Sequence, residues 1–343
     1  MMKTRILVTG GTGYIGSHTV VELQNAGYEA VIVDDLSNSR IEVLDGIEGI
    51  TGSRPGFAQF NLQDREKLDD LFASRGPFEA VVHFAASKSV GESVREPLAY
   101  YRNNLVSMLN LLDAMRAGGT AGIVFSSSCT VYGQPARLPV TEEAPFQKAS
   151  SPYGNTKRIC EEMLQDAIAA EKSLRGIALR YFNPIGAHPS ALIGELPSGV
   201  PDNLVPYITQ TAIGVRKELR VFGDDYRTPD GSCIRDYIHV VDLARAHVVA
   251  VRRLLERRDA SAFECFNIGT GTGYSVLQVV RAFEKVSGRT LNCRIVERRP
   301  GDIEQVWADT GLAERELGWK AERGLEEMLD SAWRWEQRYR GGP

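Results

Sequence analysis

Short apolar runs alternate with longer segments of helical periodicity through the first half of the chain. The apolar runs predict buried strands at residues 3–9, 28–34, 79–84, 121–126 and 175–182. Apolar residues that recur at helical spacing predict helices at residues 14–26, 97–117 and 152–172. Strands that alternate with helices in this way are typical of a parallel sheet covered by helices on both faces. We therefore expect an α/β fold with a doubly wound parallel sheet.

The pattern changes after residue 182. Five prolines and three glycines fall within residues 183–206, and a second loop rich in Gly, Pro and Asp covers residues 223–235. An irregular segment of that length inside a compact domain is usually functional or disordered. Amphipathic helices are expected near residues 240–256, 274–287 and 322–336. We expect one domain at 1–182 and a smaller mixed α/β domain at 183–343, with segments around 235–260 packing back on the first.

Composition excludes several classes of protein. The 343 residues include 40 Lys and Arg against 44 Asp and Glu, so the chain lacks the basic excess of a nucleic-acid binder. No apolar run approaches the ~20 residues of a membrane span, and the apolar stretch near the N-terminus is too short for a signal peptide. The 5 cysteines are scattered without a C-x-x-C pair, which is typical of a reducing compartment. We expect a cytoplasmic protein with no metal site and no contact with nucleic acid or membranes.

A glycine-rich turn joins the first predicted strand to the first predicted helix. Gly10 permits the tight turn, Gly13 lets the backbone approach a pyrophosphate at the helix N-terminus, and Gly16 lets the helix pack against the strand. The second strand ends at Asp34 and Asp35, where a carboxylate can accept hydrogen bonds from a ribose 2′-hydroxyl and repel a 2′-phosphate. The pattern predicts a Rossmann-type sheet that binds NAD rather than NADP. A plain polar strand end is the alternative interpretation of the two aspartates.

Tyr153 and Lys157 are the candidate proton-transfer residues. They lie four positions apart at the start of a predicted helix, so they share one helix face. A neighbouring cation lowers the pKa of a phenol from its free value of about 10, which would make Tyr153 a proton acceptor near neutral pH. Ser128 ends the preceding strand, where its hydroxyl can share a hydrogen bond with a substrate hydroxyl. Without Tyr153 and Lys157, Ser128 would be an ordinary strand-end serine.

Seven segments extend these motifs over nearly the whole chain: VTGGTGYIGSHT (8–19), VGESVREPLAYYRNN (90–104), SSSCTVYG (126–133), SPYGNTK (151–157), RYFNPIGAHPS (180–190), RDYIHVVDLA (235–244) and RRPGDIEQVWAD (298–309). In these segments the chain resembles the UDP-glucose 4-epimerase family of extended short-chain dehydrogenases/reductases. The resemblance implies tightly held NAD on residues 1–182 and a UDP-hexose on residues 183–343. It implies interconversion of UDP-glucose and UDP-galactose by oxidation at C4, rotation of the 4-keto sugar and reduction on its opposite face.

The resemblance also assigns roles to residues. Tyr153 takes the proton of the sugar 4-hydroxyl, Ser128 assists, and Lys157 holds the nicotinamide ribose and lowers the pKa of Tyr153. Further cofactor contacts are implied for Tyr14, Ile15, Asp34, Asp35, Leu36, Ser37, Asn38, Ser39, Asn61, Leu62, Phe84, Ala85, Ala86, Ser87, Lys88, Asn103 and Phe182. Substrate contacts are implied for Lys88, Ser128, Tyr153, Asn183, Asn203, Leu204, Phe222, Arg235, Arg299, Asp302 and Val306.

Two of these substrate residues are arginines, whose side chains suit a diphosphate independently of the resemblance. Arg235 and Arg299 carry forked donors suited to phosphate oxygens, although each taken alone would more often form a surface salt bridge. The resemblance places Asp302 on the uridine ribose.

The chain departs from the family pattern at three places. Asn61 stands where an aspartate is common beside the adenine, and its amide oxygen can still accept a hydrogen bond. Ala86 and Ser87 replace a usual glycine and apolar residue. Val306 borders the sugar pocket, where members restricted to simple hexoses carry a tyrosine. We hypothesise that this valine also admits UDP-N-acetylglucosamine and UDP-N-acetylgalactosamine. Alternatively, Val306 simply packs while another residue closes the pocket.

Three other functions compete with this prediction. A 4-epimerase of another nucleotide sugar, such as a uronic acid or pentose, would share the same motifs. A 4,6-dehydratase would need the acid pair of a Thr-Asp-Glu run, where this chain has Ser128, Cys129 and Thr130. A non-enzymatic NAD sensor would usually lack the Tyr153 and Lys157 pair. The resemblance further implies a homodimer in which helices 97–117 and 152–172 pair with a second copy, although a monomer could carry the same apolar faces.

Overall fold

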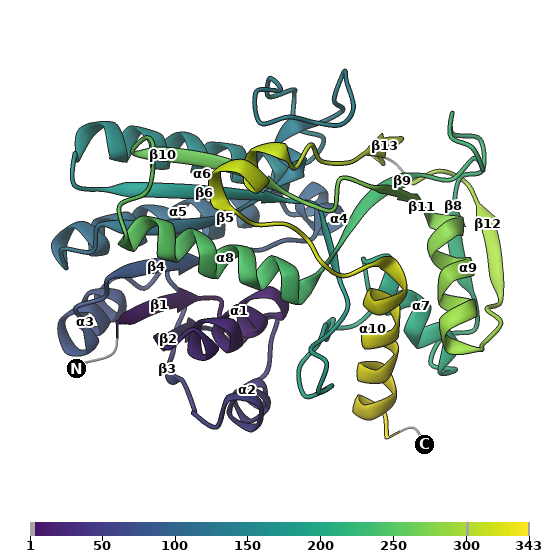
Figure 1. Ribbon diagram of the computed structural model, residues 1–343, viewed down its shortest axis with the longest axis horizontal. Helices are drawn as coiled ribbons and strands as arrows, with labels where there is room; N and C mark the ends of the chain where they lie inside the picture. Colours follow the sequence, from purple (N-terminus) through teal and green to yellow (C-terminus); the bar gives the residue numbers. More distant parts are fainter. Residues whose placement is uncertain (1–3, 300–301, 342–343) are drawn as a thin grey trace.

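The computed structural model describes residues 4–299 and 302–341, and a seven-stranded parallel sheet is its largest element (Figure 1). The strand order is β10-β6-β5-β4-β1-β2-β3. In chain order these strands are β1 (Arg5–Thr9), β2 (Glu29–Asp34), β3 (Gly56–Gln59), β4 (Ala80–His83), β5 (Gly122–Ser128), β6 (Arg175–Tyr181) and β10 (Phe263–Ile268). The chain reverses its direction of travel across the sheet between β1 and β4, and ligands of such sheets bind beyond the carboxyl ends of the strands at this point. The predicted doubly wound α/β fold is confirmed.

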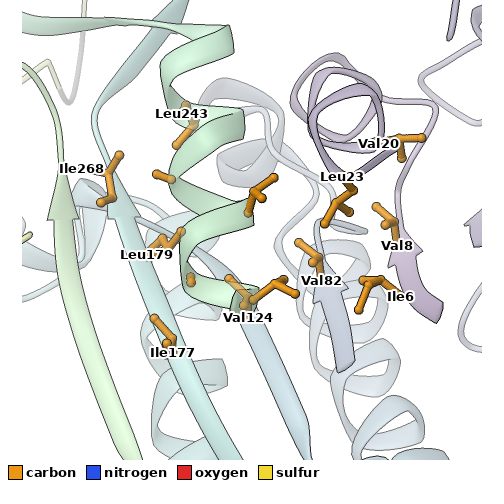
Figure 2. Close-up of a cluster of buried hydrophobic side chains, with 14 of the residues drawn as sticks. Ile6, Val8, Val20, Leu23, Val82, Val124, Ile177, Leu179, Leu243 and Ile268 are labelled. Atoms are coloured by element: carbon orange, nitrogen blue, oxygen red, sulfur yellow. The ribbon is translucent and has the colours of Figure 1, made fainter. Parts of the chain in front are cut away.

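Helices cover both faces of this sheet. They are α1 (Tyr14–Asn25), α2 (Val43–Thr51), α3 (Arg65–Arg75), α4 (Val90–Arg95), α5 (Pro97–Ala117), α6 (Pro152–Ala170) and α8 (Val240–Leu255). Because successive strand residues point to opposite faces, Ile6 and Val8 join the core under α1 and α8, whereas Leu7 joins the core under α3, α5 and α6. Figure 2 shows the first of these cores, where Leu23 of α1 and Leu243 of α8 face the sheet.

A smaller region lies beside the carboxyl ends of the sheet strands. Its strands are β7 (Asn183–Ile185), β8 (Leu219–Phe222), β9 (Ile234–His239), β11 (Gly273–Ser275), β12 (Cys293–Val296) and β13 (Gln305–Val306). Its helices are α7 (Leu204–Ala212), α9 (Val276–Ser287) and α10 (Leu325–Tyr339), with the short helical turns η1 (Cys129–Tyr132) and η2 (Ala313–Leu317) elsewhere. A third core joins α7, α9 and α10 through Ile208, Phe283 and Leu329, which are all fully buried.

The chain after residue 182 contributes to both regions. Helix α8 packs against α1 and β5, and β10 pairs with β6 at the edge of the large sheet. The remaining segments build the smaller region, which Figure 1 shows at the right of the molecule. Among the described residues, no helix combines the length and the apolar character that crossing a membrane requires.

Candidate active site

The glycine turn leaves no space for side chains. A Cβ on Gly16 would lie 2.2 Å from the carbonyl oxygen of Gly10, and one on Gly10 would lie 2.8 Å from the backbone nitrogen of Ala85. Gly10 also has a φ of 70°, which favours glycine. Helix α1 follows with Gly13 as its N-cap residue, and no side chain in the described part of the protein caps it. Its first N–H groups are therefore available to an anion such as a pyrophosphate.

The two aspartates at the end of β2 differ in their surroundings. Asp34 is buried and accepts hydrogen bonds from the backbone nitrogens of Thr12 at 3.1 Å and Leu36 at 3.0 Å, so it braces the glycine turn. Asp35 is more exposed and accepts from Ser37 and from the amide of Asn61, at 2.6 Å. Burial would raise the pKa of the Asp35 carboxyl, but these hydrogen bonds hold it below its ordinary value. Both carboxylates lie beside the turn, where the sequence predicts the adenosine ribose.

Most other residues predicted to contact the cofactor gather around this turn. Ser39 donates a hydrogen bond to Asp34 at 3.1 Å and also contacts the Thr12 hydroxyl. The amide oxygen of Asn61 accepts from the backbone nitrogen of Gln63 at 2.9 Å. Leu62 is buried in the core under α3 and α5. Tyr14 reaches toward the smaller region instead, where its hydroxyl donates to the carbonyl of Gly186 at 2.6 Å.

The loop after β4 is held by an asparagine that the sequence analysis did not single out. Ser87 donates from its backbone nitrogen to the side chain of Asn104 at 2.8 Å, and Asn104 also donates to Thr156 of α6 at 2.9 Å. Asn103 donates to the Ser87 hydroxyl at 3.1 Å. Asn104 thus connects the predicted cofactor loop to the catalytic helix. The sequence shows two adjacent asparagines, Asn103 and Asn104, but only the structure shows that Asn104 is the buried one.

The three predicted catalytic residues converge at the carboxyl end of β5. Ser128 is the last residue of β5, and its hydroxyl lies close enough to Tyr153 to act on the pKa of that phenol. Tyr153 and Lys157 are buried on α6, and the Lys157 ammonium donates to the carbonyl oxygen of Ser126 at 2.7 Å. The Lys157 nitrogen also lies 5.0 Å from the centre of the Phe125 ring. One side of α6 therefore faces the serine-rich end of β5.

Burial dominates the acidity of this trio. It raises the pKa of Tyr153 well above its ordinary value, although a hydrogen bond with Ser128 acts in the opposite direction. Burial also lowers the pKa of Lys157 to about 8. The neighbouring Tyr181 also raises the pKa of Tyr153, and burial sets the direction of this pKa shift in the protein alone. The lowering of this pKa by Lys157 and bound NAD stays a prediction.

Three predicted substrate residues meet in the smaller region. Arg299 donates to Asp302 at 3.0 Å, and a guanidinium nitrogen of Arg235 lies 3.9 Å from the same carboxylate oxygen. The Arg299 guanidinium lies 5.6 Å from the centre of the Phe222 ring. Phe222 is 38% exposed and borders an open hollow of about 820 Å³, whose lining in the described part of the chain comes from β8, β12 and the loops after them and includes no other candidate site residue. The two arginines thus lie together as a diphosphate clamp requires, with Asp302 between them.

The remaining substrate candidates are spread around this cluster. Asn203 precedes α7 and donates to the side chain of Glu195 at 2.6 Å, a contact that the sequence analysis missed. The charge of Lys88, which is exposed, acts on the same carboxyl. Phe182 and Val306 are buried in one cluster with Tyr132 of η1. Val306 therefore packs in one cluster with Phe182, a predicted cofactor contact, and with the turn η1 that follows Ser128.

Comparisons with known proteins agree on one family. UDP-glucose 4-epimerase of Bacillus subtilis (strain 168) is 54% identical over 331 residues, covering 96% of each chain. UDP-glucose 4-epimerase 2 of Arabidopsis thaliana is 50% identical over 337 residues, covering 97% of this chain and 95% of that one. The chain belongs to the UDP-glucose 4-epimerase family. The family model described as GDP-mannose 4,6 dehydratase also matches residues 7–332.

A solved structure shares the fold of this epimerase-family chain. The crystal structure of UDP-glucose 4-epimerase from Bifidobacterium longum in complex with NAD+ and UDP superimposes with a TM-score of 0.95 and 46% sequence identity. The match covers 99% of this chain and 100% of that chain. The run Ser128, Cys129 and Thr130 provides no carboxylate for removing water from a sugar. The site residues therefore favour the epimerase over the dehydratase.

Proposed function

We propose that this protein interconverts UDP-glucose and UDP-galactose with NAD as a bound cofactor. The observation that carries the proposal is the convergence of Ser128, Tyr153 and Lys157 at the carboxyl end of β5, in a chain 54% identical to a UDP-glucose 4-epimerase. A dehydrogenase that releases its product would need cofactor exchange. An epimerase returns the hydride it removes, so a buried site suits it.

The residues around the glycine turn fit NAD. The uncapped start of α1 suits its pyrophosphate, and the carboxylates of Asp34 and Asp35 disfavour a 2′-phosphate. When bound, NAD supplies an acceptor and donor of hydride for C4 and a positive charge that favours a nearby phenolate. We assign its binding to the carboxyl ends of the sheet strands within residues 1–182, and that of the UDP-sugar to the smaller region.

Tyr153 is assigned the proton of the sugar 4-hydroxyl. In the protein alone its raised pKa keeps the phenol neutral, so ionisation requires a cation beside it. Lys157 lies one turn further along the same face of α6, and we assign this charge to Lys157 acting together with the positive charge of bound NAD. Ser128 holds the 4-hydroxyl next to the phenol oxygen. All three side chains are buried, so water has little access to a 4-keto intermediate.

The arginine pair is assigned to the diphosphate. Arg235 extends from β9 and Arg299 from the segment before β13, and both approach Asp302. Forked guanidinium donors can hold the phosphate oxygens while the sugar turns about its link to them. Both faces of C4 can then be presented to the same Tyr153, and net epimerisation follows.

The test is turnover of the purified protein on UDP-galactose without added NAD. The proposal predicts UDP-glucose as the product and NAD in the denatured supernatant. A protein that needs added NAD for each turnover, or one that releases a 4-keto-6-deoxy sugar, would contradict it.

We further propose that UDP-N-acetylglucosamine and UDP-N-acetylgalactosamine are substrates. Val306 supports this because a valine at the sugar-pocket position leaves more room than a tyrosine. Val306→Tyr is then expected to abolish turnover of the N-acetyl pair before it affects UDP-galactose. Wild-type turnover of the N-acetyl pair below about a hundredth of that on UDP-galactose would refute this specificity.

We propose a cytoplasmic homodimer. Its five cysteines are free, which suits a reducing compartment. Leu98 and Leu109 of α5 are 74% and 53% exposed, and Val94 of α4 is 61% exposed. A second copy could bury these side chains in a helix bundle. Light scattering should give twice the chain mass, and Leu109→Glu should give the monomer mass, whereas a monomeric wild type would exclude the dimer.

A further inference from the structure

A buried ion pair lies behind the catalytic face of α6. Glu161 follows Lys157 by one helical turn and is fully buried. Its carboxylate accepts two hydrogen bonds from Arg180 of β6, at 2.6 Å from one terminal nitrogen and 3.0 Å from Nε. Arg180 is also buried, with a side chain that is 5% exposed. The sequence analysis assigned no role to either residue.

The same carboxylate holds the strand that carries the catalytic serine. Ser127 donates its hydroxyl hydrogen to Glu161, and Ser127 lies between Ser126, which accepts from Lys157, and Ser128. The register of β5 and β6 places Ser127 opposite Arg180. Glu161 therefore contacts the strand end and the neighbouring strand from the helix that carries Tyr153 and Lys157.

Arg180 extends the contact to the segment on the far side of Ser128. It donates to the Tyr132 hydroxyl at 3.0 Å and to the carbonyl of Glu142 at 3.3 Å. Its guanidinium lies 5.1 Å from the ring centre of Tyr132 and 4.8 Å from that of Phe146. Tyr132 ends η1, the turn that begins directly after Ser128. Both flanks of Ser128 are thus connected to one ion pair.

Stability alone is a weak explanation for such a pair. Removing two charges from water is expensive, and well-packed apolar residues often replace a buried ion pair without loss of stability. We propose that Glu161, held by Arg180, is a positioning residue that fixes Ser128 relative to Lys157 and keeps the Lys157 side chain in its ammonium form. This inference rests on the proposed epimerase function.

The charged and titratable groups around Lys157 support the proposal that Glu161 keeps this lysine protonated. Cys160 and Glu161 face it from α6 and His83 faces it from β4, while Arg180 faces Glu161 from β6. Burial lowers the pKa of Lys157 to about 8, and the negative charge of Glu161 acts in the opposite direction. Loss of that charge should therefore let Lys157 lose its proton at a lower pH.

Two variants separate positioning from folding. Glu161→Gln removes the charge but leaves Arg180 buried without a counter-ion, so it can fail to fold. The double variant Glu161→Gln/Arg180→Met removes both charges and avoids that penalty. A matched control is Glu264→Gln, because Glu264 of β10 forms a similar bidentate pair with Arg253 of α8, at 2.7 and 2.8 Å.

We expect the double variant to unfold near the wild-type urea midpoint while kcat for UDP-galactose falls by about tenfold or more. Its KM should stay within about twofold. The alkaline limb of the pH–kcat profile should move down by about one pH unit in Glu161→Gln and by less in the double variant, which also loses the positive charge of Arg180. Glu264→Gln should lower the midpoint without changing kcat or the profile. Bound NAD per chain, measured after acid release, confirms equal loading.

A stable double variant with the kcat of the wild type would overturn the inference, because the Glu161–Arg180 pair would then have a structural role only. An inactive wild-type protein would overturn the proposed function and this inference together. An active wild type with an unaltered double variant would overturn the inference alone.

Discussion

The Lys157 ammonium lies 2.7 Å from the carbonyl oxygen of Ser126 and donates a hydrogen bond to it. This contact joins the catalytic helix α6 to the end of β5, two residues before Ser128. It also places the cation in a buried site, where burial lowers its pKa to about 8. The Lys157 ammonium is thus held by a backbone oxygen, and the pKa of Tyr153 remains raised by burial. Lowering that pKa is therefore expected to depend on NAD binding beside Tyr153 and Lys157.

Tyr153→Phe should lower kcat for UDP-galactose by about 10²- to 10⁴-fold, because it removes the proposed proton acceptor. Its urea midpoint should change little, since the aromatic ring remains. Tyr28→Phe is the matched control, because Tyr28 packs against the core under α1 without a role in the site. A Tyr153→Phe protein with more than about a tenth of wild-type kcat would refute the assignment.

Gly16→Ala should reduce both stability and bound NAD. The added methyl group would lie 2.2 Å from the carbonyl oxygen of Gly10, so the turn must shift. Gly91→Ala in α4 is the control, because its Cβ would meet only Arg95 at 3.8 Å. NAD released per chain and the thermal midpoint are the measurements. Equal NAD content in the two variants would show that the tight turn is dispensable for the cofactor.

Arg299→Ala should weaken binding of UDP by about 10- to 100-fold, the usual effect of losing charge-assisted hydrogen bonds. The loss also leaves Asp302 with one fewer cation near the phosphates. Arg258→Ala removes an exposed arginine that pairs with Glu256 at 2.9 Å and should leave affinity unchanged. Calorimetry with UDP measures both. Similar affinity for the two variants would remove Arg299 from the diphosphate clamp.

The free energy of unfolding should fall as the pH decreases from about 6.5 toward 4. Burial lowers the pKa of His18 and His83 to about 3 and that of His247 to about 4. The unfolded chain therefore binds protons that the folded chain does not, and each such histidine contributes up to about 1.4 kcal/mol per pH unit. Urea denaturation at several pH values measures the slope.

His18→Asn tests the origin of that slope. The Nδ1 atom of His18 lies 2.7 Å from the carbonyl oxygen of Tyr14, and an asparagine amide can make a similar contact. The variant should show a shallower pH dependence, by about one proton. An unchanged slope would mean that His18 does not contribute to acid unfolding.

Local patterns were sufficient to predict five of the seven strands of the central sheet and its helices α1, α5 and α6. The predicted helix 14–26 corresponds to α1 at Tyr14–Asn25, because its glycine turn and apolar spacing are local features. Helix α3 (Arg65–Arg75) was not predicted, since only Leu68, Leu71 and Phe72 are buried on it. Strand β10 was not predicted because it is a strand through its pairing with β6, 87 residues earlier, and the apolar pattern does not show such distant pairing.

The residues of the candidate site could be proposed from the sequence, but their electrostatics could not. Tyr153 and Lys157 were visible from their spacing, whereas the direction of the Tyr153 pKa shift depends on burial, which only the fold determines. The pairing of Glu161 with Arg180 depends on the register of β5 and β6 and on the face of α6 that meets them. No sequence motif encodes that combination.

The most direct measurement of the central claim is the fate of the hydrogen at C4. UDP-galactose labelled with deuterium at C4 is incubated with the purified protein in ordinary water, and the product is analysed by NMR. Oxidation and reduction within one site predict UDP-glucose that keeps its deuterium at C4, with no conversion in a parallel Tyr153→Phe sample. UDP-glucose carrying solvent hydrogen at C4 would contradict the account.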